Sequence, residues 1–175
     1  MIALLLAALA APSSPSLDGR WVSPCLAMGQ GGRHGTIVAL TVSGKAVEMT
    51  GQTYAHADCD APTIETRLTG ALGDVTAHEH AVTAVLTVND VTMKPELADV
   101  VAIWNQGRAA KHCASRDWRL DERQSVAGGG CVPGHRFPER GAAIPVHATV
   151  DGDRLTLPYP LPGGDGAPIV LTRAQ

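Results

Sequence analysis

Alternating apolar and polar positions recur through the chain after residue 17, and this period of two is typical of β-strands with one buried face. In the run 46–54, for example, Val47 and Met49 fall on one face and Glu48 falls on the other. The neighbouring run 36–42 is rich in β-branched residues, which favour strands. The pattern predicts strands at 19–23, 36–42, 46–54, 63–72, 81–88, 142–150, 154–157 and 169–172.

One segment has a different period. Leu97, Val100, Val101 and Trp104 recur at i, i+3, i+4 and i+7, which is the spacing of an amphipathic helix. A Pro-Glu pair before them and a glycine after them fit the start and the end of such a helix. The Val-Val-Ala-Ile run inside the segment leaves a strand as the alternative. Further along the chain, a short strand is expected around Trp118.

Short turn sequences separate the predicted strands, so strands that are neighbours in the chain are expected to pair as a meander. The fold class we predict is mainly β: an antiparallel meandering β-barrel or half-barrel with one short α-helix. Barrels avoid exposed strand edges by closing or by covering an edge. The 175-residue length suits one such domain, which we place at 17–175.

Composition narrows the picture of the core and of the partners. Apolar residues make up 45% of the chain but aromatic residues only 3%, so the core must consist mainly of aliphatic side chains. The formal net charge is −3, and Lys and Arg form no basic patch. These charges exclude a typical nucleic-acid-binding protein.

The N-terminal segment predicts export. Residues 2–11 are all apolar and are followed by Pro-Ser-Ser-Pro, a stretch much shorter than the about 20 residues that span a bilayer. We interpret 1–11 as a signal peptide with a small-residue cleavage site at Ala8 to Ala10. The segment lacks a Lys or Arg before its apolar run, and a buried N-terminal helix is the alternative. No later stretch suits a membrane anchor, so we expect a secreted or periplasmic protein.

The four cysteines predict a disulfide framework. Three pairings are possible, and we favour Cys25–Cys59 with Cys113–Cys131 because each bond joins neighbouring elements. None of the cysteines belongs to a Cys-x-x-Cys motif, so a zinc ribbon or a thioredoxin-type redox site is poorly supported.

Two polar clusters are candidates for chemistry. On a strand, His78 and His80 would share a face and bind one metal ion, with a third ligand from His34, His56 or Asp58. A solvated loop is the favoured interpretation of these histidines. His56 and Asp58 also precede Cys59, but a cysteine nucleophile would require a free thiol, and a disulfide is favoured.

The sequence contains no nucleophile elbow and no phosphate-binding loop. We therefore expect no enzyme activity, no cofactor and no metal. Barrels of about eight strands can hold one small apolar ligand. The helix bearing Trp104 either closes one end of such a cavity or belongs simply to the core. The residues expected to line a pocket are Val38, Leu40, Val47, Met49, Leu68, Val85, Leu86 and Trp104.

Several segments resemble the adenomatosis polyposis coli down-regulated family of Wnt antagonists. The most specific is Leu-Asp-Gly-Arg-Trp-Val-Ser at 17–23 followed by Cys25. Tyr54, Cys59 and Pro62 match an aromatic-Asp-Cys-Pro segment of the family. The remaining matches are Gly70, the Leu-Ala-Asp run at 97–99, Asn105, Gln106 and Cys113.

The resemblance implies a lipocalin-like barrel with a hydrophobic pocket for an acyl chain, which in that family would explain binding to lipid-modified Wnt. For this chain it implies a module that binds lipid or a lipidated protein. Two alternatives stay open: a structural or protein-interaction domain of the envelope or extracellular space without a ligand cavity, and a metal-binding protein that uses His78 and His80.

Overall fold

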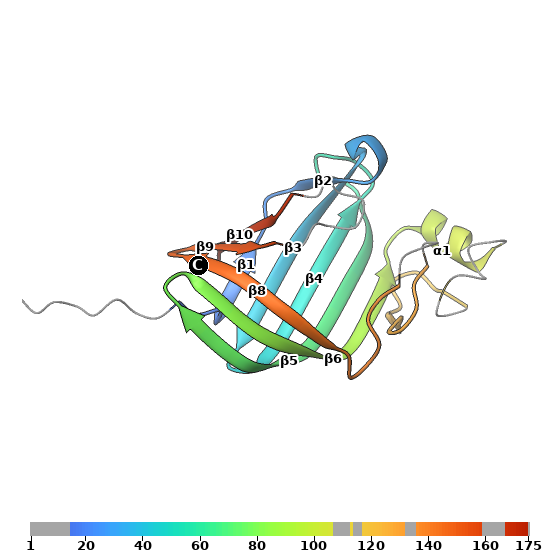
Figure 1. Ribbon diagram of the computed structural model, residues 1–175. Helices are drawn as coiled ribbons and strands as arrows, with labels where there is room; N and C mark the ends of the chain where they lie inside the picture. The colour runs from blue at the N-terminus through green and yellow to red at the C-terminus, as the bar shows by residue number, and fades with distance from the viewer. Residues whose placement is uncertain (1–14, 107–112, 114–116, 132–135, 159–166, 175) are drawn as a thin grey trace, which may run out of the picture.

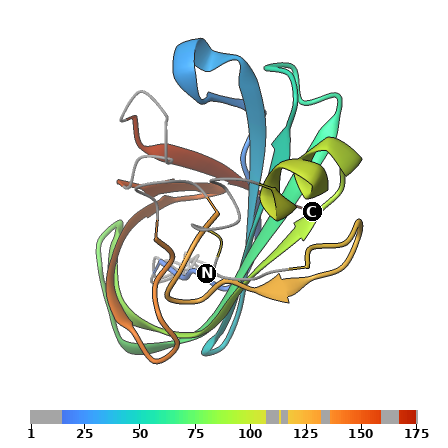
Figure 2. The ribbon, with the colours of Figure 1, turned by 90° about the vertical axis from the view of Figure 1, so that its right-hand side faces the viewer.

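A computed structural model describes residues 15–106, 113, 117–131, 136–158 and 167–174. Eight antiparallel strands form a closed barrel in the order β1-β10-β9-β8-β6-β5-β4-β3, and pairing of β1 with β3 completes the ring (Figures 1 and 2). The barrel strands are β1 (Gly19–Val22), β3 (His34–Ser43), β4 (Ala46–Tyr54), β5 (Pro62–His78), β6 (Ala81–Pro95), β8 (Ala143–Asp151), β9 (Arg154–Leu157) and β10 (Ile169–Arg173).

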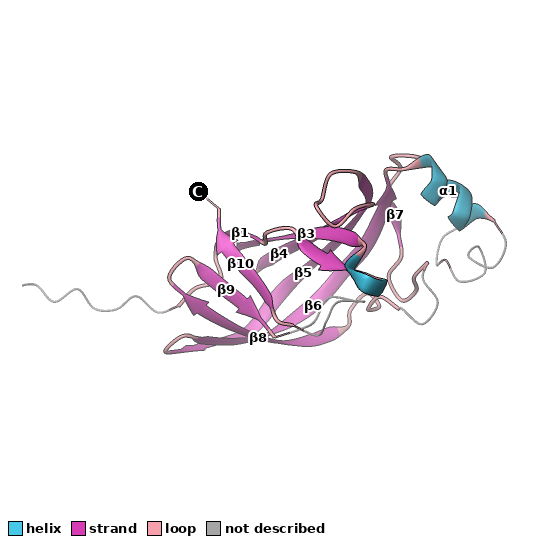
Figure 3. Ribbon diagram, turned by 90° about the horizontal axis from the view of Figure 1, so that it is seen from above, coloured by secondary structure: helices cyan, strands magenta, loops and turns pink. Residues whose placement is uncertain are grey.

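Four short elements lie outside this ring. The strand β2 (Leu26–Met28) pairs with β3 and is followed by a 3-10 turn, η1 (Gln30–Gly32). Helix α1 (Ala98–Asn105) and strand β7 (Gln124–Ser125) belong to the segment between β6 and β8. Figure 3 shows α1 at one end of the barrel strands and β7 beside the end of β6. We call the described part of this segment the cap: residues 98–106, 113, 117–131 and 136–142.

Strand β6 changes its partner partway along its length. Its register with β5 shifts between Thr69 and Gly70, which marks a β-bulge. Up to Thr87, β6 pairs with β8, whereas Thr92 and Met93 pair with β7. Beyond the bulge the sheet runs β7-β6-β5-β4-β3-β2, and among the described residues no pairing joins β7 to β2. The molecule therefore has a closed half and an open half.

The closed half surrounds a core that is aliphatic apart from Trp21. Leu155 and Leu171 have no exposed surface, and Trp21 is equally buried, with its indole nitrogen donating to the carbonyl of Leu17. Alternation along each strand places every second side chain in this core. Its other buried members are Leu17, Val38, Leu40, Val42, Val47, Leu72, Val82, Ala84, Leu86, Ala148, Val150, Leu157 and Ile169.

The open half has a second core, in which the cap covers the inner face of β6. Val91 and Met93 of β6 pack with two tryptophans of the cap, Trp104 and Trp118. The two indole rings meet edge to face with their centroids 4.7 Å apart. The side chain of Asn105 accepts from the backbone N–H of Trp118 and donates to its carbonyl, both at 2.8 Å. This pair of hydrogen bonds fixes Trp118 against the end of α1.

The structure confirms the predicted fold class, since the chain is mainly β with one helix, and the barrel is closed rather than a half-barrel. It corrects the prediction of a strand around Trp118, because that residue is buried in the cap and its backbone bonds to a side chain. Pro95 ends β6 instead of opening the helix, which begins at Ala98. Strands β5 and β6 are longer than predicted, and β2 and β7 were not foreseen.

Both predicted disulfides are present. Cys25–Cys59 ties the connection between β1 and β2 to the loop after β4, and Cys113–Cys131 lies within the cap. Gly35 makes room for the first bond, because a Cβ on this residue would lie 2.5 Å from the Sγ of Cys59. Disulfides are typical of proteins in extracellular or other oxidising compartments. The predicted signal peptide at 1–11 lies outside the described residues.

Within the described residues, the structure has no helix with the length and hydrophobicity needed to cross a membrane.

Candidate ligand-binding site

The register of the sheet places most of the predicted pocket residues on the inner face of the barrel. Leu40 pairs with Met49, and Met49 pairs with Leu68, so these three side chains share one face. Leu40 belongs to the core, and this identifies the shared face as the inner one. Val38, Val47 and Leu86 are buried in the same core, while Met49 and Leu68 are half-buried against it.

Two of the predicted pocket residues lie elsewhere. Val85 is half-buried between the inward-facing Ala84 and Leu86, and it pairs with Pro145, so its side chain lies on the outer face. Trp104 is buried in the second core under the cap and is not a member of the barrel core. The structure thus gathers six of the eight residues on one inner face and assigns the other two to different environments.

The inner face is not filled evenly. Near the turn between β3 and β4, Val47 of β4 and Leu72 of β5 are only 6% exposed. Toward the cap, the inward-facing side chains of the same two strands are all half-buried rather than buried. We call this part of the inner face the inner strip: Met49, Gly51, Thr66 and Leu68.

Gly51 lies at the centre of the inner strip. It pairs with Val38 on one side and with Thr66 on the other, so a side chain at this position would point inward. No atom of the described residues lies within 4 Å of the position that its Cβ would occupy. At Gly70, four residue pairs nearer the closed half, an added Cβ would lie 2.5 Å from the carbonyl oxygen of Thr87. As far as the described residues go, the inner face is therefore close-packed at Gly70 and open at Gly51.

Threonines continue the inner face beyond the strip toward the loop after β4. Thr36 and Thr53 pair across β3 and β4, and Thr53 faces Ile64 of β5. The hydroxyl of Thr36 donates to the carbonyl of Gln52. For the Thr66 hydroxyl, no hydrogen bond to another described residue is present. The strip thus has apolar side chains toward the closed half and hydroxyl groups toward the loop.

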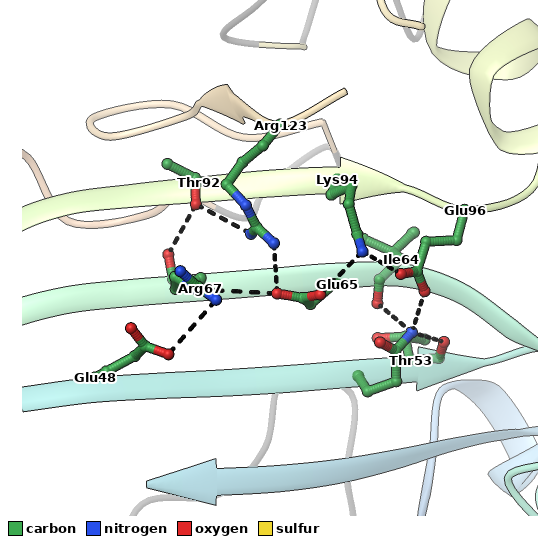
Figure 4. Close-up of polar contacts among 10 residues, drawn as sticks. Glu48, Thr53, Ile64, Glu65, Arg67, Thr92, Lys94, Glu96 and Arg123 are labelled. Carbon is green, nitrogen blue, oxygen red and sulfur yellow. Dashed lines mark hydrogen bonds and ion pairs between the residues drawn. The ribbon is translucent and has the colours of Figure 1, made fainter. Parts of the chain in front are cut away.

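The charged residues of β4 to β6 lie on the opposite, outer face. Figure 4 shows Glu65 at the centre of this network, with ion pairs to Lys94 and to Arg123 of the cap. Glu96 bonds to Lys94 at 2.6 Å, and Arg67 lies between Glu65 and Glu48. Because Arg123 comes from the cap, the network joins the cap to the barrel wall. The side-chain amide of Gln52 also donates a hydrogen bond to the carboxylate of Glu96.

The environment of these groups shifts their pKa values. Partial burial raises the pKa of Glu65, but hydrogen bonds from Arg123 and Lys94 outweigh it and hold the pKa below its ordinary value. The hydrogen bond to Glu96 raises the pKa of Lys94. Glu65 and Lys94 are therefore both charged at neutral pH, and they form an ion pair on the outer face.

A surface depression lies on the outer side of the closed half, between the β8–β9 hairpin and β10. Asp151, Asp153 and Arg154 line it on one side and Val170 and Thr172 on the other. On β10, Ile169 and Leu171 face the core, so the alternating residues at 170 and 172 face outward. The depression is therefore separate from the inner strip.

The histidine pair considered for a metal lies in the hairpin turn between β5 and β6. His78 ends β5, and His80 lies in the turn, where its ring bonds to the carbonyl of Val150. The structure groups different residues: His56, Asp58 and Asp60 have potential ligand atoms within 4.8 Å of one another. All three are exposed, and the His56 ring is bonded to Asp60, an interaction that lowers the pKa of that carboxyl group.

The arrangement around Cys59 excludes the nucleophile considered from the sequence. Its sulfur is bonded to Cys25, so no thiol is present beside His56 and Asp58. The loop instead has a structural role, since the disulfide fastens it over Gly35 of β3.

Gly51 and Thr66 were not among the predicted pocket residues. The alternation of 46–54 and 63–72 already places them on the same faces as Met49 and Leu68, so the sequence pattern could have identified them. The prediction considered large aliphatic side chains only, and a missing side chain is what leaves this part of the inner face open.

No protein-family model matches the chain, and no curated protein matches it.

Proposed function

We propose that this chain is a non-enzymatic, lipocalin-like domain that binds an acyl chain or another apolar ligand. The observation that carries the proposal is the inner strip, where Met49 and Leu68 face the inside of the barrel but are only partly buried around the open position of Gly51. A barrel with a purely structural role would be expected to fill this position, because close packing of a core stabilises the fold.

The energy of such binding comes from the apolar surface that is removed from water. Each methylene group buried against the strip contributes about 0.8 kcal/mol before the cost of ordering the ligand is subtracted. Met49 suits a variable apolar ligand, since its unbranched thioether side chain adapts to irregular shapes. Binding of this kind requires no catalytic group.

The resemblance to the Wnt-antagonist family favours the same class of ligand, because that family is understood to bind an acyl chain. For this chain the partner would be a lipid or a lipidated protein. The two disulfides support an oxidising compartment, and with the apolar run at residues 2–11 they favour a secreted or periplasmic location.

Displacement of a fluorescent fatty-acid probe from the purified protein tests the proposal. We expect saturable binding by the unaltered chain, and a bound lipid visible in its native mass spectrum. In Gly51→Leu, a leucine side chain occupies the open position, and we expect binding to weaken by about tenfold or more because the ligand competes with that side chain.

The matched control is Thr50→Leu, which places the same side chain on the outer face of the same strand. It should bind as the unaltered chain does. The proposal is wrong if the unaltered chain binds no probe and carries no lipid, or if Gly51→Leu binds normally. The first of these results is the one expected for a structural or protein-interaction domain.

A further inference from the structure

The inner strip is uncharged along its whole length. Its four residues are Met49, Gly51, Thr66 and Leu68, and the charged residues of the same two strands, Glu48, Glu65 and Arg67, alternate with them on the outer face. The outer charges are also already engaged, since Glu65 and Arg67 belong to the network with the cap. No charged side chain points inward from the described residues of β3 to β6 in the ranges 36–42, 47–53, 64–72 and 82–93.

A charged side chain of the closed half, that of Arg173, packs on a core residue away from the inner strip. Arg173 pairs with Trp21 and stacks over its ring, with the guanidinium carbon 4.0 Å from the ring centroid. The same guanidinium donates to the carbonyl of Asp18, whose carboxylate binds Gly44 in the turn between β3 and β4. Arg173 thus lies at the end of the barrel opposite the hydroxyl-bearing end of the strip, and its guanidinium already contacts the carbonyl of Asp18 and the carboxylate of Asp153.

This distribution determines which ligand the strip accepts. A carboxylate or phosphate moved from water to an uncharged inner face loses its hydration and gains no opposite charge, which is strongly unfavourable. An alcohol, an ester or a glycerol head loses less and needs only neutral donors and acceptors. The hydroxyls of Thr66 and Thr53 supply such groups beside the apolar surface of Met49 and Leu68.

We propose that the inner strip selects an uncharged single-chain lipid, such as a monoacylglycerol or a long-chain alcohol, over a free fatty acid. The hydrocarbon chain lies against Met49 and Leu68, and the neutral head lies at the threonines. The inference rests on the proposed function, because it specifies the ligand of the same site.

Competition between two ligands of equal chain length tests the inference. Monolauroylglycerol and laurate are compared at pH 8, where the carboxyl group of laurate is ionised because the pKa of a carboxylic acid in water lies well below 8. A neutral polarity-sensitive probe reports displacement, so that neither ligand has an advantage from the charge of the probe. We expect monolauroylglycerol to bind about tenfold tighter or more, since its head requires no opposite charge.

A charge placed on the strip should reverse this preference. Thr66→Lys brings an ammonium group to the inner face, so laurate should gain affinity and monolauroylglycerol should lose it. Thr87→Lys is the matched control, because Thr87 is exposed on the outer face of β6, and it should keep the original preference. Circular dichroism spectra verify that both variants fold. If Thr66→Lys fails to fold, the comparison of the two lipids in the unaltered chain still decides the question.

The possible outcomes distinguish a failure of the selectivity from a failure of the proposed function. Binding of laurate as tight as, or tighter than, that of monolauroylglycerol overturns the selectivity and leaves the proposed apolar-ligand function standing. Binding of neither lipid overturns both. A preference for monolauroylglycerol that Thr66→Lys reverses supports both.

Discussion

The two halves of the molecule are held together by different means. In the closed half, eight strands complete a ring, and its core is almost entirely aliphatic. In the open half, the ring is interrupted where β6 stops pairing with β8 and pairs with β7 instead. Two tryptophans of the cap pack on the inner face of β6 in this half. Closure stabilises one half through backbone pairing, whereas the other depends on a separate segment that packs on it.

The difference explains where the inner strip lies. The cap covers the inner face of β6 and part of β5 but leaves the neighbouring inward positions on β4 only partly buried, Gly51 among them. The strip therefore occupies the border between the cap and the closed ring. A ligand bound there would contact Leu68, which packs against both cores.

The largest expected effect comes from a large-to-small change in each core. Leu171→Ala in the closed half and Trp118→Ala in the cap should each remove about 3 to 4 kcal/mol of packing energy, because both side chains are fully buried. If the halves are held independently, Leu171→Ala lowers mainly the stability of the closed ring, and Trp118→Ala loosens mainly the cap.

Amide hydrogen exchange distinguishes these cases residue by residue. Loss of protection in Trp118→Ala is expected at Val91, Val126 and the residues of α1, with β9 and β10 unchanged. Equal loss of protection in both halves would show that the cap and the barrel unfold as one cooperative unit, and the contrast drawn above would then be wrong.

The sequence predicted the closed half better than the open half. In the closed half, alternation alone identifies the strands, because each one buries a single face against the same core. Both disulfides, which lie outside the closed half, were also predicted, because the cysteines lie between predicted elements. These features depend on local pattern, which a single sequence displays.

The cap has no such pattern. Trp118 is flanked by charged residues in alternation and was expected in a solvated strand, but tertiary packing against Trp104 and the side chain of Asn105 determines its position. The partner exchange of β6 is equally nonlocal, because it depends on a bulge at Asn89 and Asp90 that the sequence marks only as a strand break.

The candidate site shows the same division. Its residues share faces that alternation predicts correctly, but their exposure depends on where the cap ends, and no local pattern reports this.

A second contrast, smaller in energy, lies between two glycines of the open half. At Gly35, an added Cβ would lie 2.5 Å from the Sγ of Cys59 and 2.7 Å from the carbonyl oxygen of His56. Gly35→Ala should therefore cost about 1 to 3 kcal/mol, as overpacking does. At Gly51 the same change meets open space, so Gly51→Ala should be neutral or slightly stabilising, because alanine orders the strand at a lower entropic cost.

Urea denaturation of the two variants measures this difference directly. A destabilisation of Gly51→Ala as large as that of Gly35→Ala would show that the inner strip is closely packed, and would remove the basis of the proposed ligand site. Because both glycines lie on strands of the same half, differences between the two cores do not confound the comparison.

The smallest expected effect concerns the ion pairs that join the cap to the barrel wall. Burial raises the pKa of Glu65, but the hydrogen bonds from Arg123 and Lys94 lower it further, so the folded pKa lies below the unfolded value. A second ion pair joins the cap to β6, in which hydrogen bonds from Arg140 lower the pKa of Asp90. A carboxyl group with a lowered pKa stabilises the fold above its unfolded pKa, and that stability is lost as the pH falls through the folded pKa.

The cap should therefore loosen before the ring as the pH falls below about 4, the ordinary range of these carboxyl groups. Glu65→Gln keeps the shape of the side chain but removes the titration, so it should cost about 1 kcal/mol at neutral pH and make the stability less dependent on acid. Because Arg123 donates from the cap, protection of cap amides should change more than protection of β9 or β10. Glu48→Gln, at the outer end of the same network and more exposed, is the control that should change little. An acid transition identical in Glu65→Gln and the unaltered chain would mean that packing of the tryptophans alone holds the cap.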